Sequence, residues 1–465
     1  MSDGPSHTMS TLDDVLDRSA LAQSSLLRDG SVSVEELTRA SLDRIARRDP
    51  QLNAFVQQIP RRALATARSL DAERRRHRGA ARGPLWGLPT AMKDIHMTRG
   101  MFLRLGSRSF RYLWSPIDDV SSAAVRRAGM VMLGKLATSE LAILPFIDTE
   151  LHPPTRNPWD PSRYSGGSSG GSSAAIASGM LSVAVASDGA GSIRIPAAFC
   201  GLVGHKPTRD LLPNPFARFE PLGLATVGPH ARSVDDAAAL MDVLLGGRGG
   251  PFLSAVQRPP ARLRVRFTTQ STVIESSPEI VAAVKRVAAL LEELGHHVEE
   301  GSGYEGTVEE FMPMFRFLAR GMFVPSEAGL QGTTRLLRER ARAVDLSTAM
   351  ACREMFRARM DAWFGDVDLW VTPTVGAPAP LVGTWADASP QALLDGAAPL
   401  GAFTAGFNAS GHPATSIPLW PQPGAAPLGV QLIAPRGQDL RALATARALM
   451  EALGTPLAPI ASMGR

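Results

Sequence analysis

Lysine is almost absent from this basic chain of 465 residues. Lysine and arginine together number 49 against 44 aspartates and glutamates, but only Lys93, Lys135, Lys206 and Lys285 are lysines. Arginine stays charged at any ordinary pH, whereas a buried lysine can lose its proton and act as a base. Lys93 and Lys206 lie in or beside the motifs described below, whereas Lys285 has the pattern of a helix surface. The scarcity of lysine therefore draws attention to Lys93 and Lys206.

Cysteine and long apolar runs are also scarce. Cys200 and Cys352 are the two cysteines, which excludes a disulfide framework and favours a reduced, cytoplasmic setting. The N-terminal segment 1–30 is interrupted by acidic residues and has no continuous apolar core, so it does not read as a signal peptide. The longest apolar-looking segment, 174–186, is too short and too rich in serine and glycine to cross a bilayer. We therefore expect a soluble protein with no membrane partner.

The excess of arginine raises the alternative of a nucleic-acid-binding protein. A basic run covers positions 74–78, Arg-Arg-Arg-His-Arg. Aromatic residues do not alternate with it and no groove-reading motif accompanies it, so a solvated helix end is the favoured interpretation. Salt-dependent binding to DNA without turnover of amides would support the alternative.

Two glycine-rich turns are the most informative motifs that the sequence contains. Gly166–Ser172 reads GGSSGGS, and Asp188–Ser192 reads DGAGS. Between them lies a segment of small and apolar residues, which a flexible glycine–serine linker would not have. Glycine permits positive φ angles and close backbone approach, so two turns that flank a buried segment can bring two serines together.

These motifs resemble the amidase signature family. The family's hallmarks are GGSSGGS, a later D-x-(G/A)-G-S-I-R turn, here Asp188–Arg194, and G-x-P-x-x-x-K-D, here Gly87–Asp94. The separation of Ser168 from Lys93 along the chain, and that of Ser192 from Ser168, also look like those of the family. The resemblance covers roughly positions 30–455 and is highly specific, because three separate motifs occur in the right order and register.

The resemblance implies an amidase that needs no cofactor or metal. Ser192 would be the nucleophile, Ser168 would relay its proton to Lys93, and the peptide bond before Ser168 would be cis. The backbone N–H groups of Gly189, Ala190, Gly191 and Ser192 would stabilise the oxyanion. Lys93 must be neutral to accept a proton, and burial favours that form. Asp94, next to it on a strand, should point to the opposite face.

Two differences between this sequence and the family's motifs bear on the type of amidase that the resemblance implies. Ala190 stands where many relatives have glycine, and the family tolerates both. The transfer-RNA amidotransferase subunit has glutamine after S-I-R and a glycine- and arginine-rich tract after K-P-T, whereas this chain has Ile195 and, at positions 209–213, RDLLP. We therefore favour a stand-alone amidase. A glutamine-hydrolysing amidotransferase subunit remains the alternative, and glutaminase activity that appears only with partner subunits would identify it.

The strand–helix–strand pattern from position 262 onward favours an α/β class with a parallel or mixed sheet covered by helices. The resemblance implies the amidase signature fold: a single domain over residues 11–465, after a disordered segment 1–10, with a mixed, mostly parallel central sheet and helices on both faces. Helices are predicted at 11–28, 33–48, 60–78, 120–128, 233–245, 278–294 and 439–453. Strands are predicted at 90–94, 131–135, 263–267, 297–299, 368–372 and 429–433.

The partner is expected to be a small-molecule amide, and a homodimer is compatible with the sequence. Three stretches are rich in large apolar residues: Met101–Leu103, Ile143–Ile147 and Phe311–Phe315. If all three line one cleft, the acyl group of the substrate should be hydrophobic or aromatic. Ordinary core packing is the alternative explanation for each stretch.

Overall fold

The computed structural model describes residues 9–77, 82–217, 220–246, 250–420, 422 and 425–462. Its strands are β1 (Phe55–Gln58), β2 (Pro89–Lys93), β3 (Met101–Phe102), β4 (Trp114–Ser115), β5 (Val131–Leu136), β6 (Val183–Asp188), β7 (Val203–Lys206), β8 (Thr226–Ala231), β9 (Arg264–Phe267), β10 (His297–Glu300), β11 (Leu369–Pro373), β12 (Ala414–Leu419) and β13 (Leu428–Ile433).

Helices occur along the whole length of the described chain. They are α1 (Met9–Asp17), α2 (Ala20–Asp29), α3 (Val34–Leu52), α4 (Pro60–Arg76), α5 (Val120–Arg127), α6 (Gly170–Ala177), α7 (Arg194–Cys200), α8 (Val234–Leu244), α9 (Pro251–Val256), α10 (Pro278–Glu293), α11 (Val308–Gly321), α12 (Gly332–Ala341), α13 (Leu346–Phe364), α14 (Pro390–Ala397), α15 (Ala405–Ser410) and α16 (Asp439–Ala452). Short 3-10 helices are η1 (Arg108–Phe110), η2 (Glu140–Ala142), η3 (Glu327–Gly329) and η4 (Ala398–Gly401).

One mixed sheet organises the described residues. Eleven strands follow the order β1-β5-β2-β6-β8-β7-β12-β13-β11-β9-β10. The pairs β5-β2-β6 and β11-β9-β10 are parallel, as strand–helix–strand crossovers require. The pairs between β6 and β11 are antiparallel, and so is β1 with β5. The predicted α/β class with a mixed sheet is therefore confirmed, and the antiparallel middle is a feature that the sequence patterns did not indicate.

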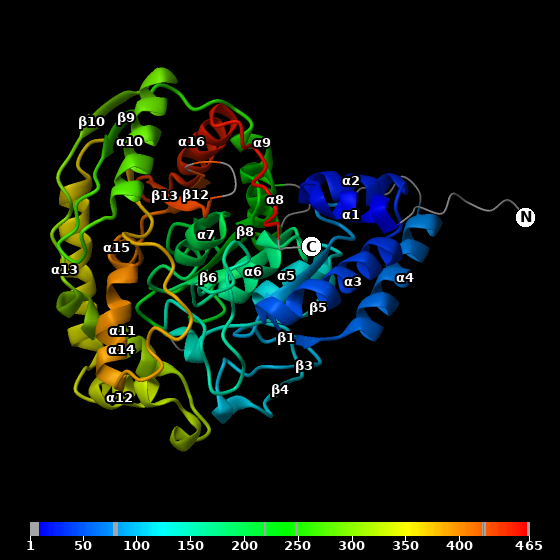
Figure 1. Cartoon of the computed structure of the whole chain (residues 1–465), viewed down its shortest axis with the longest axis horizontal. Coiled ribbons are helices and arrows are strands. Elements are labelled where there is room, and N and C mark those ends of the chain that lie inside the picture. Colours follow the sequence, from blue (N-terminus) through cyan, green and yellow to red (C-terminus); the bar gives the residue numbers. More distant parts are fainter. Residues whose placement is uncertain are drawn as a thin grey trace, which may run out of the picture.

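Helices cover both faces of this sheet. Every residue of β2, β5, β6, β7, β8, β11 and β12 is buried, which requires cover on each side. Helix α16 packs on α8, α9 and α10, and α8, α10 and α16 also pack on strands, while α6 packs on α7 and on β2, β6 and β8. Figure 1 shows α1–α4 gathered at one end of the molecule and α11–α14 at the other.

Most predicted elements occur, with two differences near the N-terminus. The predicted helix 11–28 is two helices, because Ser19 caps α2 by accepting a hydrogen bond from the N–H of Ala22. The next helix was predicted to stop before Pro50, but α3 continues to Leu52 with that proline inside its last turn. The predicted disordered segment 1–10 lies outside the described residues except for Met9 and Ser10, which begin α1.

The described part of the basic run, residues 74–77, occupies a helix end, whereas Arg78 lies outside the described residues. Arg74, Arg75 and Arg76 form the last turn of α4, where cations are favoured by the helix dipole. None of the described helices combines the length and hydropathy that a bilayer-spanning segment needs.

The sheet also brings two motifs to one edge. β2 and β6 are adjacent and parallel, so their carboxyl ends, Lys93 and Asp188, meet at the same side of the sheet. The two glycine-rich turns lead into α6 and α7 beside this edge. The candidate site is built there.

Candidate active site

Lys93 ends β2 and is completely buried. Its Nζ donates hydrogen bonds to the hydroxyls of Ser168 at 2.7 Å, Ser169 at 2.9 Å and Ser187 at 2.9 Å. The two residues that sequence analysis joined, Lys93 and Ser168, are therefore in direct contact. Ser169 and Ser187 were not predicted, although Ser169 follows Ser168 and Ser187 precedes Asp188 in the same motifs.

Lys93 is held in an environment that favours its neutral form. Burial lowers the pKa of Lys93 from 10.5 to about 7, and the carboxylate of Asp188 opposes that shift only in part. Asp94 does not reach Lys93; its carboxylate pairs with Nζ of Lys135 on β5 at 2.9 Å. This agrees with the expectation that Asp94 points to the opposite face of the strand. The neutral amine keeps two N–H donors and one lone pair, so it can accept a hydrogen bond from one of these three hydroxyls, as a base must.

The first glycine-rich turn places Ser168 beside Lys93. The Gly167–Ser168 peptide bond is cis, and Gly166 has a φ of 84°. A Cβ atom on Gly167 would lie 2.5 Å from the backbone nitrogen of Phe146, so no larger residue fits. After this turn α6 begins at Gly170, and Ser168 is fully buried.

The second turn is held by the carboxylate of Asp188. This carboxylate accepts hydrogen bonds from the N–H groups of Gly191 at 2.6 Å and Ile193 at 3.2 Å, and from Arg194 at 2.9 and 3.0 Å. Burial alone would raise the pKa of Asp188, but the guanidinium of Arg194 holds it at about 2. A buried, permanently ionised carboxylate thus fixes the loop on which Ser192 stands.

Asn408 and Gln431 complete the support of this turn. Asn408 donates to the backbone oxygen and carboxylate of Asp188, both at 2.9 Å, and accepts from Arg194 at 2.6 Å. Gln431 on β13 accepts from Arg194 at 3.3 Å. Sequence analysis placed Gln431 in the predicted strand 429–433 and gave neither Asn408 nor Gln431 a role. Because both lie near the other end of the chain, no local pattern could have linked them to the turn.

Ser192 lies on this turn at the edge of a cavity. It is partly exposed and lines the cavity described below. Its hydroxyl makes no hydrogen bond to any other described residue, unlike the buried hydroxyl of Ser168. Ser192 is therefore free to meet a ligand.

The four predicted oxyanion donors do not behave alike. The N–H of Gly191 donates to the carboxylate of Asp188 at 2.6 Å and so helps to hold the loop. The N–H groups of Gly189, Ala190 and Ser192 make no hydrogen bond within the described residues. These three remain candidates.

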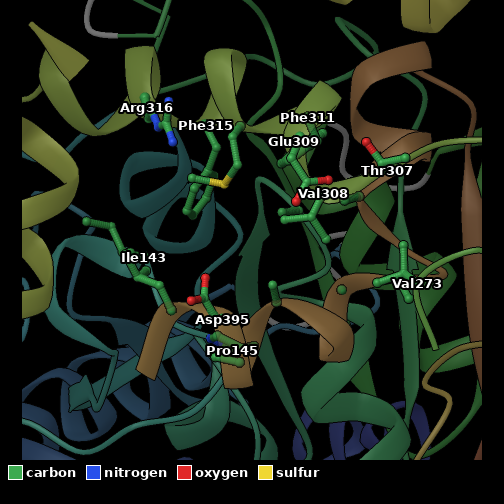
Figure 2. A pocket seen from close by; sticks show the side chains of 18 of the residues that line it. Ile143, Pro145, Val273, Thr307, Val308, Glu309, Phe311, Phe315, Arg316 and Asp395 are labelled. Carbon is green, nitrogen blue, oxygen red and sulfur yellow. The ribbon is translucent and has the colours of Figure 1, made fainter. Parts of the chain in front are cut away.

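A cavity of about 400 Å³ opens at Ser192, a size typical of small-molecule sites. Its walls come from the Ile143–Pro145 loop, the Ser192 turn, η4, α15 and the helices α11, α12 and α14. Figure 2 shows Phe311, Phe315 and Arg316 of α11 on one side, and Ile143, Pro145 and Asp395 on another. Apolar side chains form most of the inner surface.

Two of the three predicted apolar stretches line this cavity. Ile143, Leu144 and Pro145 contribute from the second stretch, and Phe311, Met312 and Phe315 from the third. The first stretch does not: Met101 and Phe102 form β3, which pairs with β4. There Met101 joins the main hydrophobic core, so ordinary packing accounts for it.

Two buried histidines, His205 and His230, make hydrogen bonds with neighbouring groups. Within the described ranges, no group of three or more histidine, cysteine, aspartate or glutamate side chains could hold a metal ion. Of the buried histidines, His230 contacts Ser173 and the backbone oxygen of Ile193, and His205 contacts Thr415 and Asp439. Both histidines have pKa values lowered chiefly by burial.

Comparisons with known proteins agree on one family. The sequence model of the family described as Amidase matches residues 36–316 and 308–443. A putative amidase of Synechocystis sp. is 31% identical over 457 residues, which cover 94% of this chain and 88% of that protein.

Two solved structures extend the likeness to the fold. The 6-aminohexanoate cyclic dimer hydrolase complexed with substrate is 30% identical, with a TM-score of 0.86. The match covers 97% of this chain and 100% of the hydrolase chain. A bacterial aryl acylamidase of the amidase signature family is 25% identical, with a TM-score of 0.83, and covers 97% of this chain and 99% of its own.

Proposed function

Because the chain belongs to the amidase family, and is thus a hydrolase of carbon–nitrogen bonds other than peptide bonds, we propose that it cleaves a carboxamide through an acyl-enzyme on Ser192. The observation that carries this proposal is the contact of 2.7 Å between the Lys93 amine and the Ser168 hydroxyl. That contact is buried, and it lies at the sheet edge that also carries the Ser192 turn.

In the first half-reaction the Ser192 hydroxyl attacks the amide carbon. Its proton passes to Ser168, whose own proton passes to neutral Lys93. The carbonyl oxygen becomes an oxyanion that accepts hydrogen bonds from free N–H groups of the turn, for which Gly189, Ala190 and Ser192 are the candidates. Removing one such donor costs about 10²–10³ in rate in other hydrolases.

The tetrahedral intermediate then collapses and the carbon–nitrogen bond breaks. The proton held by Lys93 returns through Ser168 to the leaving nitrogen, which departs as ammonia or an amine. Water attacks the resulting ester, gives its proton through Ser168 to Lys93, and releases the carboxylic acid. Lys93 gives the proton back to Ser192, so each group ends the cycle as it began.

The substrate that the cavity supports best has an extended or aromatic acyl group. Phe311, Met312 and Phe315 line a cavity of about 400 Å³ together with Ile143 and Leu144. Burial of each CH₂ against such walls contributes about 0.8 kcal/mol. The names of the two structural relatives described above, a 6-aminohexanoate cyclic dimer hydrolase and an aryl acylamidase, are compatible with such a substrate.

The amidotransferase alternative receives less support. It needs a partner subunit that accepts ammonia, whereas the names of the two structural relatives are those of amide hydrolases. Assay of glutaminase activity with and without candidate partner subunits separates the two functions. Activity that appears only in the complex would favour the amidotransferase.

A fluorophosphonate probe with peptide mapping tests the proposal. The probe should label Ser192, and Ser192→Ala should abolish both labelling and amide hydrolysis. The variant should unfold like the wild type, because the Ser192 hydroxyl makes no hydrogen bond with a described residue that its removal would break. Labelling at another residue, together with an active Ser192→Ala enzyme, would overturn the assignment.

A further inference from the structure

Two arginines on the cavity wall lack an acidic partner among the described residues. Arg316 of α11 and Arg340 of α12 both line the cavity that opens at Ser192. Neither guanidinium makes a hydrogen bond or an ion pair with another described residue. In contrast, Arg338 of α12 is held by Glu327 at 2.8 Å, and Arg359 of α13 by Glu310 at 2.7 Å. The cavity therefore contains cationic donors that the described chain leaves unused.

Arg316 is the more constrained of the two. Its side chain is only partly exposed, and its Nε is buried without an acceptor in the described part of the chain. A buried donor left without a partner is costly, so such atoms are rare unless a ligand or water completes them. Figure 2 shows the Arg316 side chain reaching from its helix toward the space between Phe315 and Ile143. Arg340, by comparison, is exposed.

The helix pattern explains why Arg316 shares a face with apolar residues. Val308, Phe311, Met312, Phe315 and Arg316 recur at intervals of three or four residues along α11, so they form one face. The first four of these residues are apolar, and Arg316 lies at the C-terminal end of this face. A ligand that lies along this face would meet apolar side chains over most of its length and a cation at one end.

Acidic groups also border the cavity, but they do not neutralise Arg316. Glu309 of α11 and Asp395 of α14 line the cavity and are exposed. Asp395 accepts a hydrogen bond from Gln391 at 2.6 Å. No ion pair joins Glu309 or Asp395 to Arg316 among the described residues. Both carboxylate residues are exposed to solvent, whereas Arg316 is only partly exposed.

We propose that Arg316, assisted by Arg340 at the rim, binds a carboxylate of the substrate several bonds away from the amide that Ser192 attacks. This inference rests on the proposed function and deepens it, since it assigns the substrate class: an amide with an apolar middle and an anionic end. Guanidinium donors match the two oxygens of a carboxylate in a fork geometry that lysine cannot reproduce. The carboxylate belongs to the acyl half or to the amine half of the substrate.

Paired substrates that differ by one group provide the test. Hexanamide and adipamate differ only in that a methyl is replaced by a carboxylate on the acyl half. N-propylhexanamide and N-hexanoyl-β-alanine make the same exchange on the amine half. The wild type should prefer the carboxylate in one of these pairs, and the pair that shows the preference identifies the half that reaches Arg316.

Variants separate recognition from structure. Arg316→Ala and the bulkier Arg316→Met should lower kcat/KM for the preferred carboxylate by about 10- to 100-fold, the range for a lost hydrogen bond to a charged group. Both should lower kcat/KM for the neutral amide by less than for its carboxylate counterpart. Arg340→Ala should have a smaller effect of the same kind. Arg342→Ala is the matched control, because Arg342 is an exposed arginine at the end of the same helix that does not line the cavity.

Binding is measured alongside turnover, by calorimetric titration of each pair into Ser192→Ala with and without Arg316→Ala. A carboxylate preference that disappears with Arg316 supports the inference. An equal loss for charged and neutral ligands, or no preference in either pair, overturns it. Hydrolysis of hexanamide without any carboxylate preference would sink this inference alone, whereas carboxylate-dependent binding without hydrolysis of any amide would count against the proposed function alone.

Discussion

Replacing Gly191 by alanine tests how the Ser192 turn is held. Gly191 has a φ of 130°, a region that residues with a side chain rarely adopt. An added Cβ would lie 2.2 Å from Oγ1 of Thr404 and 2.7 Å from Cδ1 of Ile195. The backbone and its surroundings therefore both demand glycine at this position.

The magnitude follows from two contributions. The unfavourable backbone angle costs roughly 1–3 kcal/mol. Thr404 must also turn away, and it would lose its hydrogen bond of 2.7 Å to the backbone oxygen of Ala190, a loss of about 0.5–1.5 kcal/mol. Together the change costs about 1.5–4.5 kcal/mol, divided between lower stability and a displaced Ser192 turn.

Gly189 supplies the matched control on the same turn. An added Cβ there would meet only Cδ1 of Leu318 at 3.8 Å, an ordinary contact. We expect Gly191→Ala to lose at least about tenfold in kcat/KM, since about 1.4 kcal/mol at the reacting group is a factor of ten. Its free energy of unfolding in urea should fall too, while Gly189→Ala stays within about threefold in kcat/KM. Wild-type activity and stability in Gly191→Ala, or equal losses in both variants, would refute this account of the turn.

Lys93→Arg should be nearly as inactive as Lys93→Ala, because a guanidinium cannot give up its proton at neutral pH; near-normal activity in steady-state assays would show that only a positive charge is needed. For the wild type, kcat/KM should rise with pH up to about 7 and level off above it, because the neutral amine is the active form and burial lowers the pKa of Lys93 to about 7. Along a series from acetamide to hexanamide, kcat/KM should rise up to about fourfold per CH₂, and Phe315→Ala should flatten the rise. A flat wild-type series would point to a small or polar acyl group.

Part of the candidate site was predicted through the resemblance to the amidase signature family. The two glycine turns and the lysine motif carry that resemblance, which implied that Lys93 and Ser168 meet although they lie on separate segments of the chain. The strand–helix–strand pattern at 263–299, in contrast, predicted β9, α10 and β10 from local periodicity alone.

Sequence reasoning failed where contacts between segments far apart in the chain determine the structure. Asn408 and Gln431 support the Asp188 turn from the other end of the chain, and nothing near them in the sequence shows that contact. The hydrogen bond from the Gly191 N–H depends on the orientation of the Asp188 carboxylate, which composition does not reveal. Apolar stretches are similarly ambiguous: Phe311–Phe315 faces a cavity, whereas Met101 joins the core.

The central claim is that Lys93 is a neutral base at working pH, and nuclear magnetic resonance can test it directly. The chain has so few lysines that labelling lysine with carbon-13 at Cε gives few signals, and the one missing in Lys93→Met belongs to Lys93. Lys206→Met identifies the other buried lysine whose pKa is lowered to about 7 by burial. The Lys93 signal should titrate with a midpoint near pH 7, charged below it and neutral above it. A midpoint near the ordinary lysine value of 10.5 would contradict the account, because Lys93 would then be charged when the enzyme works.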